Sequence, residues 1–493
     1  MRTLGAAQAV EHEYEGRADR LPRRAASLLV AFVAAASCAR PPIRPSAGVG
    51  TSPASYDVST LVVPSLGLAV TATFAASPDW FVVDDDAAPF VHDVEYGGGG
   101  GWRAARREGL AWQVPCASGC AVRYGFALAE AAAQVHDTDT ALAAGGLVVA
   151  PPSAWLLRPT AASPVGRLRF HVRTPAGTSF ATGVRPSPDG APDTFEADMA
   201  DLEEASYAVF GSFRSESIAS GSGRVQIVAA PRGIALAEDQ VTAWVRSAVD
   251  GIADYYGRFP VDRVLVIVVP GEQAETRGKT LGGGGPAVLV RAGTNVSAST
   301  VGDDWVMTHE LLHATLPSLA HEHAWLGEGI ATYVEPIVRT RAGRVPVDRF
   351  WRDLIEGLPQ GLPSAGDQGL DRTHTWGRTY WGGALLCFVV DVRIREVSGQ
   401  KRSFDDALRA IAAAGGGAEH VWDVERFVQE ADRATETTEM ARAYRELALA
   451  PGTVDLSVLW RRLGVRLSGT DVVFDDTAPL ASITTAITSR PKP

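Results

Sequence analysis

The first half of the chain shows the hydrophobic pattern of a β-rich domain. Up to about residue 228, short apolar runs alternate with Gly, Pro and Asp, a spacing typical of strands joined by turns. The clearest predicted strands are residues 61–63, 69–74, 168–172 and 225–228. Because these runs are short and recur between turn signals, we predict a β-sandwich-like N-terminal domain over residues 56–222.

The second half follows a mostly helical pattern. In its first element, apolar side chains recur at helical spacing: Val241, Trp244, Val245, Ala248, Val249, Ile252 and Tyr256. Two apolar runs, residues 264–269 and 287–290, predict buried strands. The pattern then becomes helical, so we predict a mostly α-helical domain over residues 223–438. Residues 439–493 form a small C-terminal extension, which is either an appended domain or a segment packed on the helices.

The N-terminus has the features of an export signal. A basic patch at Arg20, Arg23 and Arg24 precedes an apolar stretch, and small residues lead to Cys38. This order is typical of a secretory signal peptide, here over residues 1–37. Small residues before a cysteine also resemble the lipobox of bacterial lipoproteins, so we expect Cys38 to be lipidated. The alternative is a plain signal peptide that is cut nearby.

A tether follows the signal. Residues 38–55 are rich in Pro, Ser and Gly, which predicts a flexible linker. The protein is therefore expected to be exported and held at the cell envelope, on its periplasmic or extracellular face, by a lipid anchor in the membrane.

Composition limits the possible partners. The chain has 493 residues, of which 46 % are apolar and 21 % charged, as in ordinary soluble globular proteins. No apolar run reaches about 18 residues, so no helix of the mature protein is expected to span a membrane. The net charge of −11 argues against nucleic acid as a partner, because phosphate binding needs clustered Lys and Arg. Nothing in the sequence specifies an oligomeric state.

Three further cysteines have different expected roles. Cys116 and Cys120 flank a tight turn between two strand-like runs. In an exported protein a disulfide between them is expected. A zinc site is the alternative, but neither a second cysteine pair nor a nearby histidine supports it. Cys387 lies in an apolar helical run and is expected to be a buried small hydrophobe.

A metal-binding motif occupies residues 309–313, which match H-E-x-x-H. On a helix, positions i and i+4 share one face, so His309 and His313 can point at the same metal ion. Glu310 lies beside His309 and can take a proton from a water on that metal. The motif alone is weak, since a helix with two surface histidines also matches it.

The following segment offers a third metal ligand. Residues 325–335 contain Glu328, Thr332 and Glu335 at positions i, i+4 and i+7, on one helical face. Glu328 would complete a site of two histidines and one carboxylate with an open fourth position, the arrangement of catalytic zinc sites. We therefore predict one zinc ion (Zn2+) per chain, held by His309, His313 and Glu328.

His321 and His323 are an alternative source of the third ligand. A three-histidine site of the metzincin kind needs Gly where Leu316 stands and His where Leu319 stands. Neither residue is present, which favours Glu328. The other interpretation of the two histidines is a solvated turn.

These motifs together resemble a known superfamily. H-E-x-x-H followed by W-L-x-E-G-x-A-x-Y-x-E is similar to the gluzincins, the thermolysin-like metallopeptidases, and residues 379–386 are similar to their Y-x-x-G-A-L helix. Residues 256–263, 391–396 and 403–408 are most similar to the glycyl aminopeptidase family. The resemblance implies a thermolysin-like catalytic domain that hydrolyses peptide bonds. It also implies that Tyr380 donates a hydrogen bond to the oxyanion of the transition state; the alternative is an ordinary buried aromatic.

Specificity is predicted from a missing carboxylate. In the resembled families an acidic residue on a Gly-rich strand binds the free amino group of the substrate, but residues 282–290 contain no Asp or Glu. Glu272 and Glu275 lie earlier, in a predicted loop. Arg291, if it faces the cleft, would repel an ammonium group; otherwise it is a solvated strand end. We therefore expect endopeptidase-like cleavage of a peptide or protein substrate.

Two alternative functions stay open at this point. The first is an aminopeptidase of the same superfamily. The second is a non-catalytic cell-surface scaffold that retains the peptidase fold. The intact Glu310 argues against a scaffold, because a structural zinc site needs no base and usually closes with four protein ligands.

Overall fold

The structure is a computed structural model that describes residues 54–63, 65–75, 79–98, 100–160 and 166–490. All of them belong to one structural unit, Pro53–Pro493. The predicted signal peptide, the lipidation candidate Cys38 and almost all of the predicted tether lie outside the described residues. No helix among the described residues is long and apolar enough to cross a bilayer.

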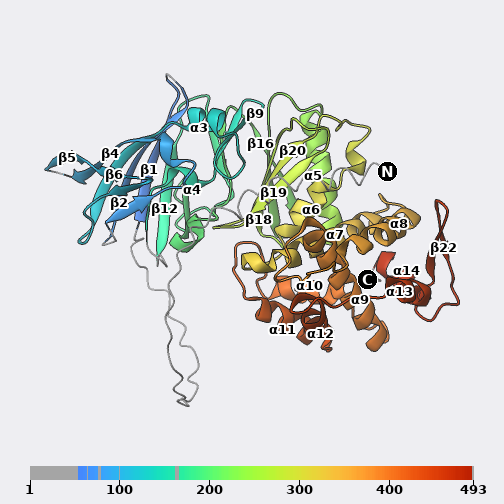
Figure 1. Ribbon diagram of the computed structural model, residues 1–493. Coiled ribbons are helices and arrows are strands. Elements are labelled where there is room, and N and C mark those ends of the chain that lie inside the picture. Colours follow the sequence, from blue (N-terminus) through green and yellow to red (C-terminus); the bar gives the residue numbers. More distant parts are fainter. Residues whose placement is uncertain (1–53, 64, 76–78, 99, 161–165, 491–493) are drawn as a thin grey trace, which may run out of the picture. The chain divides into compact units, whose positions relative to one another are not determined.

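The N-terminal region is built on a seven-stranded sheet (Figure 1). In spatial order its strands are β14 (Thr194–Asp198), β12 (Arg167–Arg173), β1 (Ala54–Leu61), β2 (Gly67–Phe74), β8 (Cys120–Phe126), β4 (Val91–Gly98) and β5 (Gly101–Ala104). β1 pairs with β12 in parallel and with β2 in antiparallel register. Along β1 every second side chain is buried, as expected for a strand with one face in a core.

Two four-stranded sheets complete this region. One consists of β13 (Ser179–Thr182), β15 (Ala208–Gly211), β10 (Leu147–Val149) and β9 (Leu142–Ala144), and the other of β11 (Arg158–Pro159), β3 (Trp80–Val82), β7 (Ala111–Gln113) and β6 (Arg106–Glu108). Short helices lie between the strands: η1 (Ala88–Phe90), α3 (Leu128–Gln134), α4 (Pro152–Trp155) and η2 (Met199–Leu202). One core joins side chains of all three sheets, among them Tyr56, Phe81 and Phe210.

The strand predictions fail at one place in this region. Residues 69–74 and 168–172 lie in β2 and β12. Residues 61–63 were expected to form a strand, but β1 ends at Leu61, and Val62 and Val63 lie exposed in the turn to β2. The prediction is wrong because the buried face of β1 begins at Ala54 and includes small and polar side chains, such as Ala54 and Thr60, which give a weak hydrophobic signal.

A second region is organised around a five-stranded sheet. In spatial order its strands are β16 (Ser215–Ser220), β17 (Gly223–Ala229), β18 (Arg263–Pro270), β20 (Ala287–Ala292) and β19 (Arg277–Leu281). The three central strands are parallel, and the edge strands β16 and β19 are antiparallel to them. Because β16 pairs with β17, the sheet begins at Ser215, ahead of the boundary at residue 223 that the sequence suggested.

This sheet is buried on both faces. On β18, Val264, Val266 and Val268 join the core of the helices, including α5 (Glu238–Tyr256). The alternate side chains Leu265, Ile267 and Val269 join a separate core with strands of the N-terminal region. The continuous apolar run that predicted this strand is typical of central parallel strands, which are covered on both sides.

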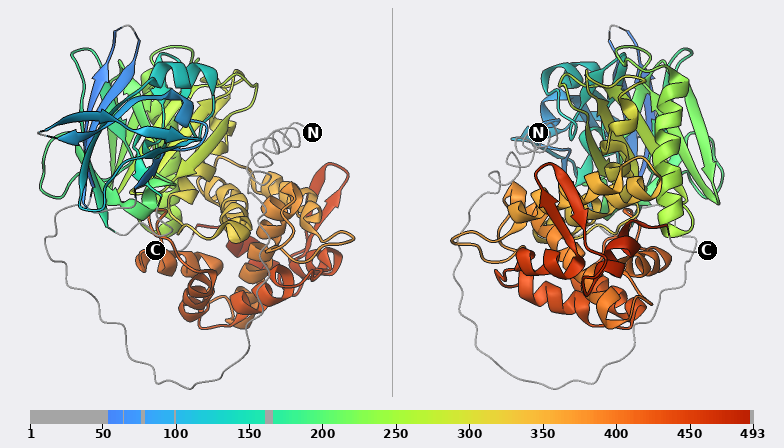
Figure 2. Two further views of the ribbon diagram at one scale, coloured as in Figure 1. Left: turned by 60° about the vertical axis from the view of Figure 1, so that its left-hand side comes forward. Right: turned by 90° about the vertical axis from the view of Figure 1, so that its right-hand side faces the viewer.

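The remaining chain is mostly helical (Figure 2). Its helices are η3 (Val301–Asp303), α6 (Val306–His313), η4 (His321–His323), α7 (Ala324–Arg341), α8 (Val347–Gly357), η5 (Leu358–Gly361), η6 (Gly377–Gly382), α9 (Gly383–Val397), α10 (Phe404–Ala413) and α11 (Val424–Thr435). Their apolar side chains form one large core with α5 and the adjoining face of the five-stranded sheet.

The C-terminal extension packs into that same core. It contains α12 (Glu439–Ala443), η7 (Tyr444–Ala448), α13 (Leu456–Leu463), β21 (Val465–Ser468), β22 (Asp471–Phe474) and α14 (Ala481–Thr488). Its buried members of the core include Met440, Leu447, Leu463 and Ile483. Arg341 of α7 also donates a hydrogen bond to the backbone oxygen of Ile487, at 3.0 Å. The extension is therefore a packed segment of the helical region.

A buried ion network joins α7, α9 and α10. The Arg341 guanidinium donates to Asp405 at 2.7 Å, and Arg395 donates to Asp391 at 2.8 Å. The hydroxyl of Tyr333 donates to Asp391 at 2.9 Å. Two positive and two negative charges thus balance inside the core. Removal of one partner would leave a buried charge unpaired, so the network specifies how the three helices pack.

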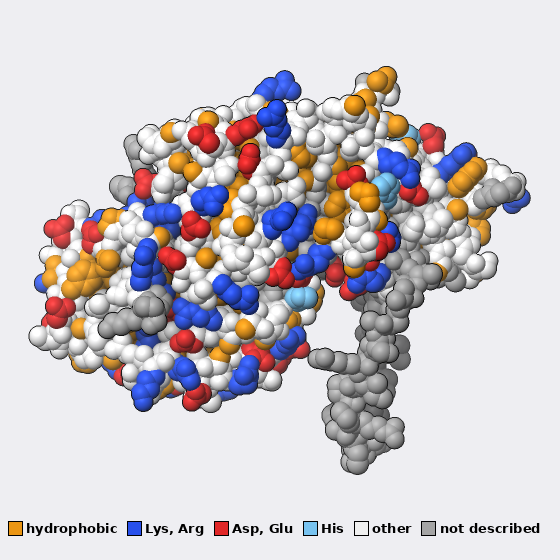
Figure 3. All heavy atoms as spheres, turned by 180° about the vertical axis from the view of Figure 1, so that it is seen from behind, with side chains coloured by type: hydrophobic (Ala, Val, Ile, Leu, Met, Phe, Trp, Pro, Cys, Tyr) orange, Lys and Arg blue, Asp and Glu red, His pale blue; other side chains and the backbone are white. Residues whose placement is uncertain are grey.

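Cysteines and surface charges complete the description. Cys116 and Cys120 form a disulfide at the start of β8, and Cys387 is a buried free thiol in α9. On the face seen in Figure 3, acidic and basic side chains are interspersed. The absence of a nucleic-acid partner stays a prediction from net charge.

Two glycines let α7 and α9 approach each other closely. A Cβ atom added at Gly383 would lie 2.2 Å from the backbone oxygen of Trp325, and one added at Gly329 would lie 2.3 Å from the backbone of Gly383. Side-chain atoms do not approach backbone this closely, so the contact requires glycine on both helices. It joins the W-L-x-E-G segment directly to the Y-x-x-G-A-L segment.

We predict that Gly383→Ala destabilises the protein. Ala is the better helix former by about 1 kcal/mol, so helix propensity alone would predict stabilisation. The clash with Trp325 should dominate, because overpacking typically costs about 1–3 kcal/mol. Thermal unfolding should show a lower Tm for Gly383→Ala. Gly302→Ala is the matched control, since nothing lies within 4 Å of its added Cβ. An unchanged or raised Tm for Gly383→Ala would contradict the close contact.

Candidate metal centre

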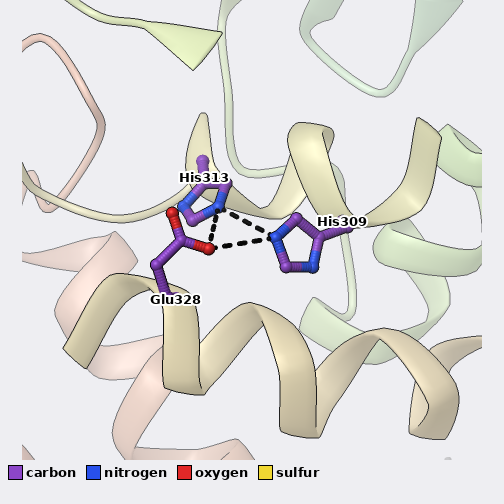
Figure 4. Close-up of side chains that lie close together, drawn as sticks. All are labelled: His309, His313 and Glu328. Atoms are coloured by element: carbon purple, nitrogen blue, oxygen red, sulfur yellow. Dashed lines mark hydrogen bonds and ion pairs between the residues drawn. The ribbon is translucent and has the colours of Figure 1, made fainter. Parts of the chain in front are cut away.

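The predicted metal ligands come together between α6 and α7. Asp304 caps the start of α6 by accepting from the backbone N–H groups of Val306 and Met307, at 3.0 and 3.4 Å. His309 and His313 then lie one helical turn apart and point to the same side. Figure 4 shows that Glu328 reaches them from the facing helix α7.

The three donor atoms form a small triangle. His309 Nε2 lies 3.2 Å from both Glu328 Oε2 and His313 Nε2, and His313 Nε2 lies 3.4 Å from Glu328 Oε2. Tetrahedral ligands at about 2.0–2.1 Å from zinc are themselves about 3.3 Å apart, so the donor set fits this ion. Among the described residues no other His, Cys, Asp and Glu side chains form such a group.

Burial differs across the cluster. The side chain of His309 is 6 % exposed, whereas those of His313 and Glu328 are 19 % and 21 % exposed. The cluster is therefore anchored on the His309 side and open to solvent on the other, as a substrate would require. The Trp305 ring packs edge-on against the His309 ring, with centroids 5.1 Å apart.

Electrostatics tie the three ligands together. Burial acts to lower the pKa of His313, but the charge and hydrogen bond of Glu328 and the charge of Glu310 raise it to about 9. Burial acts to raise the pKa of Glu328, yet the two histidines hold that pKa well below its usual range. Glu328 is therefore ionised at neutral pH, the state in which a carboxylate binds a metal.

Glu310 is buried beside the cluster. Burial raises the pKa of its carboxyl group, while the nearby histidines and the hydroxyl of Thr280 oppose that rise. Thr280 belongs to the edge strand β19 and donates to Glu310 Oε2 at 2.8 Å. A raised pKa brings a carboxylate closer to the range of an effective general base.

Tyr380 lies in η6, which packs along α7. η6 is a π-helical segment, a form that is rare and frequent at functional sites. The Tyr380 ring stacks on Trp376, with centroids 5.8 Å apart. Since Gly383 directly follows η6 and contacts Gly329, the neighbour of Glu328, the segment of Tyr380 lies beside the helix that carries the third ligand.

The alternative ligands lie outside the cluster. The ring of His323 bonds through Nδ1 to Asp371 at 2.9 Å, and Asp371 also accepts from Trp325 Nε1 and the Tyr444 hydroxyl. The ring of His321 lies near His374, with centroids 6.1 Å apart. His323 is thus part of a structural hydrogen-bond network around Asp371.

The glycine run after β19 does not form the strand that faces the cluster. A Cβ added at Gly282, Gly283 or Gly285 would lie within 2.0–2.5 Å of a backbone oxygen, of Ala418, Glu204 and Gly183 respectively. The glycine run therefore packs directly against backbone segments of both the N-terminal and the helical regions. β19 and β20 both lie against α6, and neither contains a carboxylate.

Arg291 points away from α6. It shares a face of β20 with Leu289, which packs on the N-terminal region, whereas Val288 and Val290 face the helices. Glu272 is largely exposed and pairs with His136 at 3.4 Å. The structure thus removes Arg291 from the cluster. Sequence reasoning also missed Thr280, because a threonine on a strand carries no catalytic signature of its own.

Comparison with solved structures identifies the fold. The structure is similar to the crystal structure of an aminopeptidase N family protein from Idiomarina loihiensis, with a TM-score of 0.63 over 84 % of this chain and 78 % of that chain. The chain has an aminopeptidase N-like fold. The sequences are only 15 % identical, so the likeness concerns the fold alone. No family model and no curated protein matches the sequence.

This likeness confirms the coarser part of the fold prediction. A β-rich N-terminal region and a helical region with an aminopeptidase-like fold are present. The finer resemblance to thermolysin-like and glycyl aminopeptidases stays a prediction from the motifs.

We predict that Glu328→Ala loses zinc whereas His321→Ala and His323→Ala keep it. Changes in residues around metal ligands already cost about 10–100-fold in affinity, so loss of a direct ligand should cost more than about 100-fold. Metal analysis after dialysis should find about one zinc per chain in the two histidine variants. Retention of zinc by Glu328→Ala together with its loss from either histidine variant would contradict the ligand assignment.

Proposed function

We propose that this protein is a zinc-dependent peptidase that hydrolyses peptide bonds at the His309–His313–Glu328 cluster. The observation that carries the proposal is the triangle formed by the donor atoms of these three residues, 3.2–3.4 Å apart. The buried Glu310 lies next to it, on the helix that carries the two histidines. Three ligands with an exposed side match a catalytic zinc site, whereas structural sites close with four. The aminopeptidase N-like fold agrees with a peptidase.

Different residues of the cluster are proposed to have different roles in hydrolysis. A bound zinc ion supplies a Lewis acid that acidifies water and polarises the scissile carbonyl. Glu310 takes the proton from the attacking water and passes it to the leaving amine. Its burial beside the cluster keeps the carboxylate close to the ligands and raises its affinity for the proton. Glu328 would hold the ion as an ionised carboxylate beside the two histidines.

Tyr380 is proposed to stabilise the oxyanion. The role comes from the resemblance of residues 379–386 to the gluzincin helix and is supported by the position of η6 along α7. A phenol hydroxyl near the reacting carbonyl would stabilise charge that develops only in the transition state. The stacking of Tyr380 on Trp376 limits the motion of its ring.

An aminopeptidase is the second candidate. The name of the structural neighbour favours it, since that protein belongs to the aminopeptidase N family. The strand against α6 favours an endopeptidase, because β19 offers no carboxylate to a substrate ammonium. An unpaired buried ammonium is costly, so we propose endopeptidase-like action. A non-catalytic scaffold is disfavoured by the buried, hydrogen-bonded Glu310.

The setting of the reaction is proposed from the sequence. Export and a membrane anchor at Cys38 lie outside the described residues and stay predictions, as does a peptide or protein as substrate. Membrane fractionation of the wild-type protein and Cys38→Ser would test the anchor, and a soluble wild type would argue against it.

Cleavage of casein or of a peptide library tests the proposed function. The wild type should cleave, and a chelator should stop it until zinc is restored. Glu310→Gln should keep its zinc and lose at least about 100-fold in kcat, because general-base catalysis contributes about 10²–10⁴-fold. Tyr380→Phe should lose about 100-fold in kcat with little change in KM. Glu322→Gln, an exposed position, is the control. Normal turnover by Glu310→Gln would reject the proposal.

A matched peptide pair tests the specificity. An N-acetylated peptide should be cut at least as fast as its free-amine form, because β19 has no carboxylate that could bind the ammonium group of a free N-terminus. Comparison of kcat/KM for the two peptides measures the effect directly. Efficient turnover of aminoacyl amides with failure on acetylated peptides would instead assign the protein to the aminopeptidases.

A further inference from the structure

Two residues of β19 hold the Glu310 side chain. The Thr280 hydroxyl oxygen lies 2.8 Å from Glu310 Oε2 and 2.9 Å from the backbone oxygen of the same residue. Gly278 lies two positions earlier, on the same face of the strand. A Cβ added there would lie 2.3 Å from Glu310 Cγ. Gly278 and Thr280 thus form a cradle, here called the β19 cradle, that fits the glutamate closely.

The position of the β19 cradle is set from two sides. Within the sheet, Gly278 pairs with Val290 and Thr280 with Val288. On the opposite face, Lys279 forms an ion pair with Asp139 of the N-terminal region, because alternate residues of a strand point to opposite faces. Movement of the cradle relative to α6 would therefore disturb both the sheet and the contact with the N-terminal region.

The two contacts of Thr280 restrain Glu310 at its side chain and at its backbone. The hydroxyl donates to Oε2, and its oxygen also lies within hydrogen-bond distance of the backbone oxygen of the same residue. A threonine hydroxyl has one proton to donate and can rotate, so it can donate to either oxygen without movement of a heavy atom. The Glu310 carboxyl group is thus held between the Thr280 hydroxyl and Gly278.

We propose that Thr280 is a positioning residue that holds the Glu310 carboxyl group in place beside the metal-ligand cluster, with Gly278 providing the space. This inference rests on the proposed function. The competing explanation is structural. The backbone oxygen of Glu310 lies in the last turn of α6, where carbonyl groups lack helical partners, so Thr280 would only stabilise the helix end.

Thr315 offers a matched control for that explanation. Its hydroxyl donates to the backbone oxygen of Leu312, also in the last turn of α6, at 2.7 Å. Its other partner is the Tyr256 hydroxyl, at 2.9 Å. Thr315→Val therefore removes a buried hydroxyl at the same helix end whose partners are Leu312 and Tyr256.

The test compares Thr280→Val, Thr280→Ser, Gly278→Ala and Thr315→Val for kcat, KM, bound zinc and Tm. Thr280→Val should lower kcat about 10-fold or more, because it removes part of the contribution that Glu310 makes as a general base. KM and zinc content should stay nearly unchanged. Thr280→Ser keeps the hydroxyl and should recover most of kcat. Gly278→Ala should lower kcat as well, because it displaces Glu310. Thr315→Val should lower Tm but leave kcat as in the wild type.

Several results would overturn the positioning role. They are wild-type kcat in Thr280→Val, no recovery in Thr280→Ser, an equal loss of kcat in Thr315→Val, or loss of zinc together with kcat. If Thr280→Val does not fold, Thr280→Ala is measured against the same controls. Normal turnover by Glu310→Gln would reject the proposed function and this inference together. An inactive Glu310→Gln beside a fully active Thr280→Val would reject the inference alone.

Discussion

The burial of the five-stranded sheet on both faces is the constraint from which the candidate site follows. Alternate side chains of β18 enter two different cores, one shared with the helices and one shared with the N-terminal region. This arrangement leaves β19 at the edge, with Thr280 facing α6 and Lys279 facing the N-terminal region. The helix that carries His309, Glu310 and His313 is thus positioned against a strand that the N-terminal region helps to hold.

A second set of contacts positions the other half of the site. The contact between Gly329 and Gly383 sets the distance between α7 and α9, and with it the position of η6. The buried pairs formed by Asp391 and Asp405 with arginines then tie α7, α9 and α10 together away from the cluster. The motifs around these residues, which suggested a family resemblance, therefore include positions with structural roles as well as the residues proposed to be catalytic.

Local spacing accounts for most of what was predicted well. The i and i+4 relation of His309 and His313 holds on any helix, and the apolar run of β18 is buried in any central parallel strand. Local reasoning placed a strand at residues 61–63 and missed most of β1, because alternation with small and polar inward side chains is a weak signal. The close packing of the glycine run at residues 282–285 also escaped local reasoning. Its glycines meet backbone from distant segments, including Ala418 and Glu204, which no local pattern reveals.

The sequence by itself determined which chemical groups are available and which of them share a helical face. It determined the pair of histidines, the neighbouring glutamate and a carboxylate on a second helix, because helical periodicity is a local property. Only the tertiary structure decided that Glu328 meets both imidazoles, that Thr280 and Gly278 hold Glu310, and that Arg291 faces away. These outcomes depend on strand register and on how closely helices approach, and both are set by contacts between residues far apart in the chain.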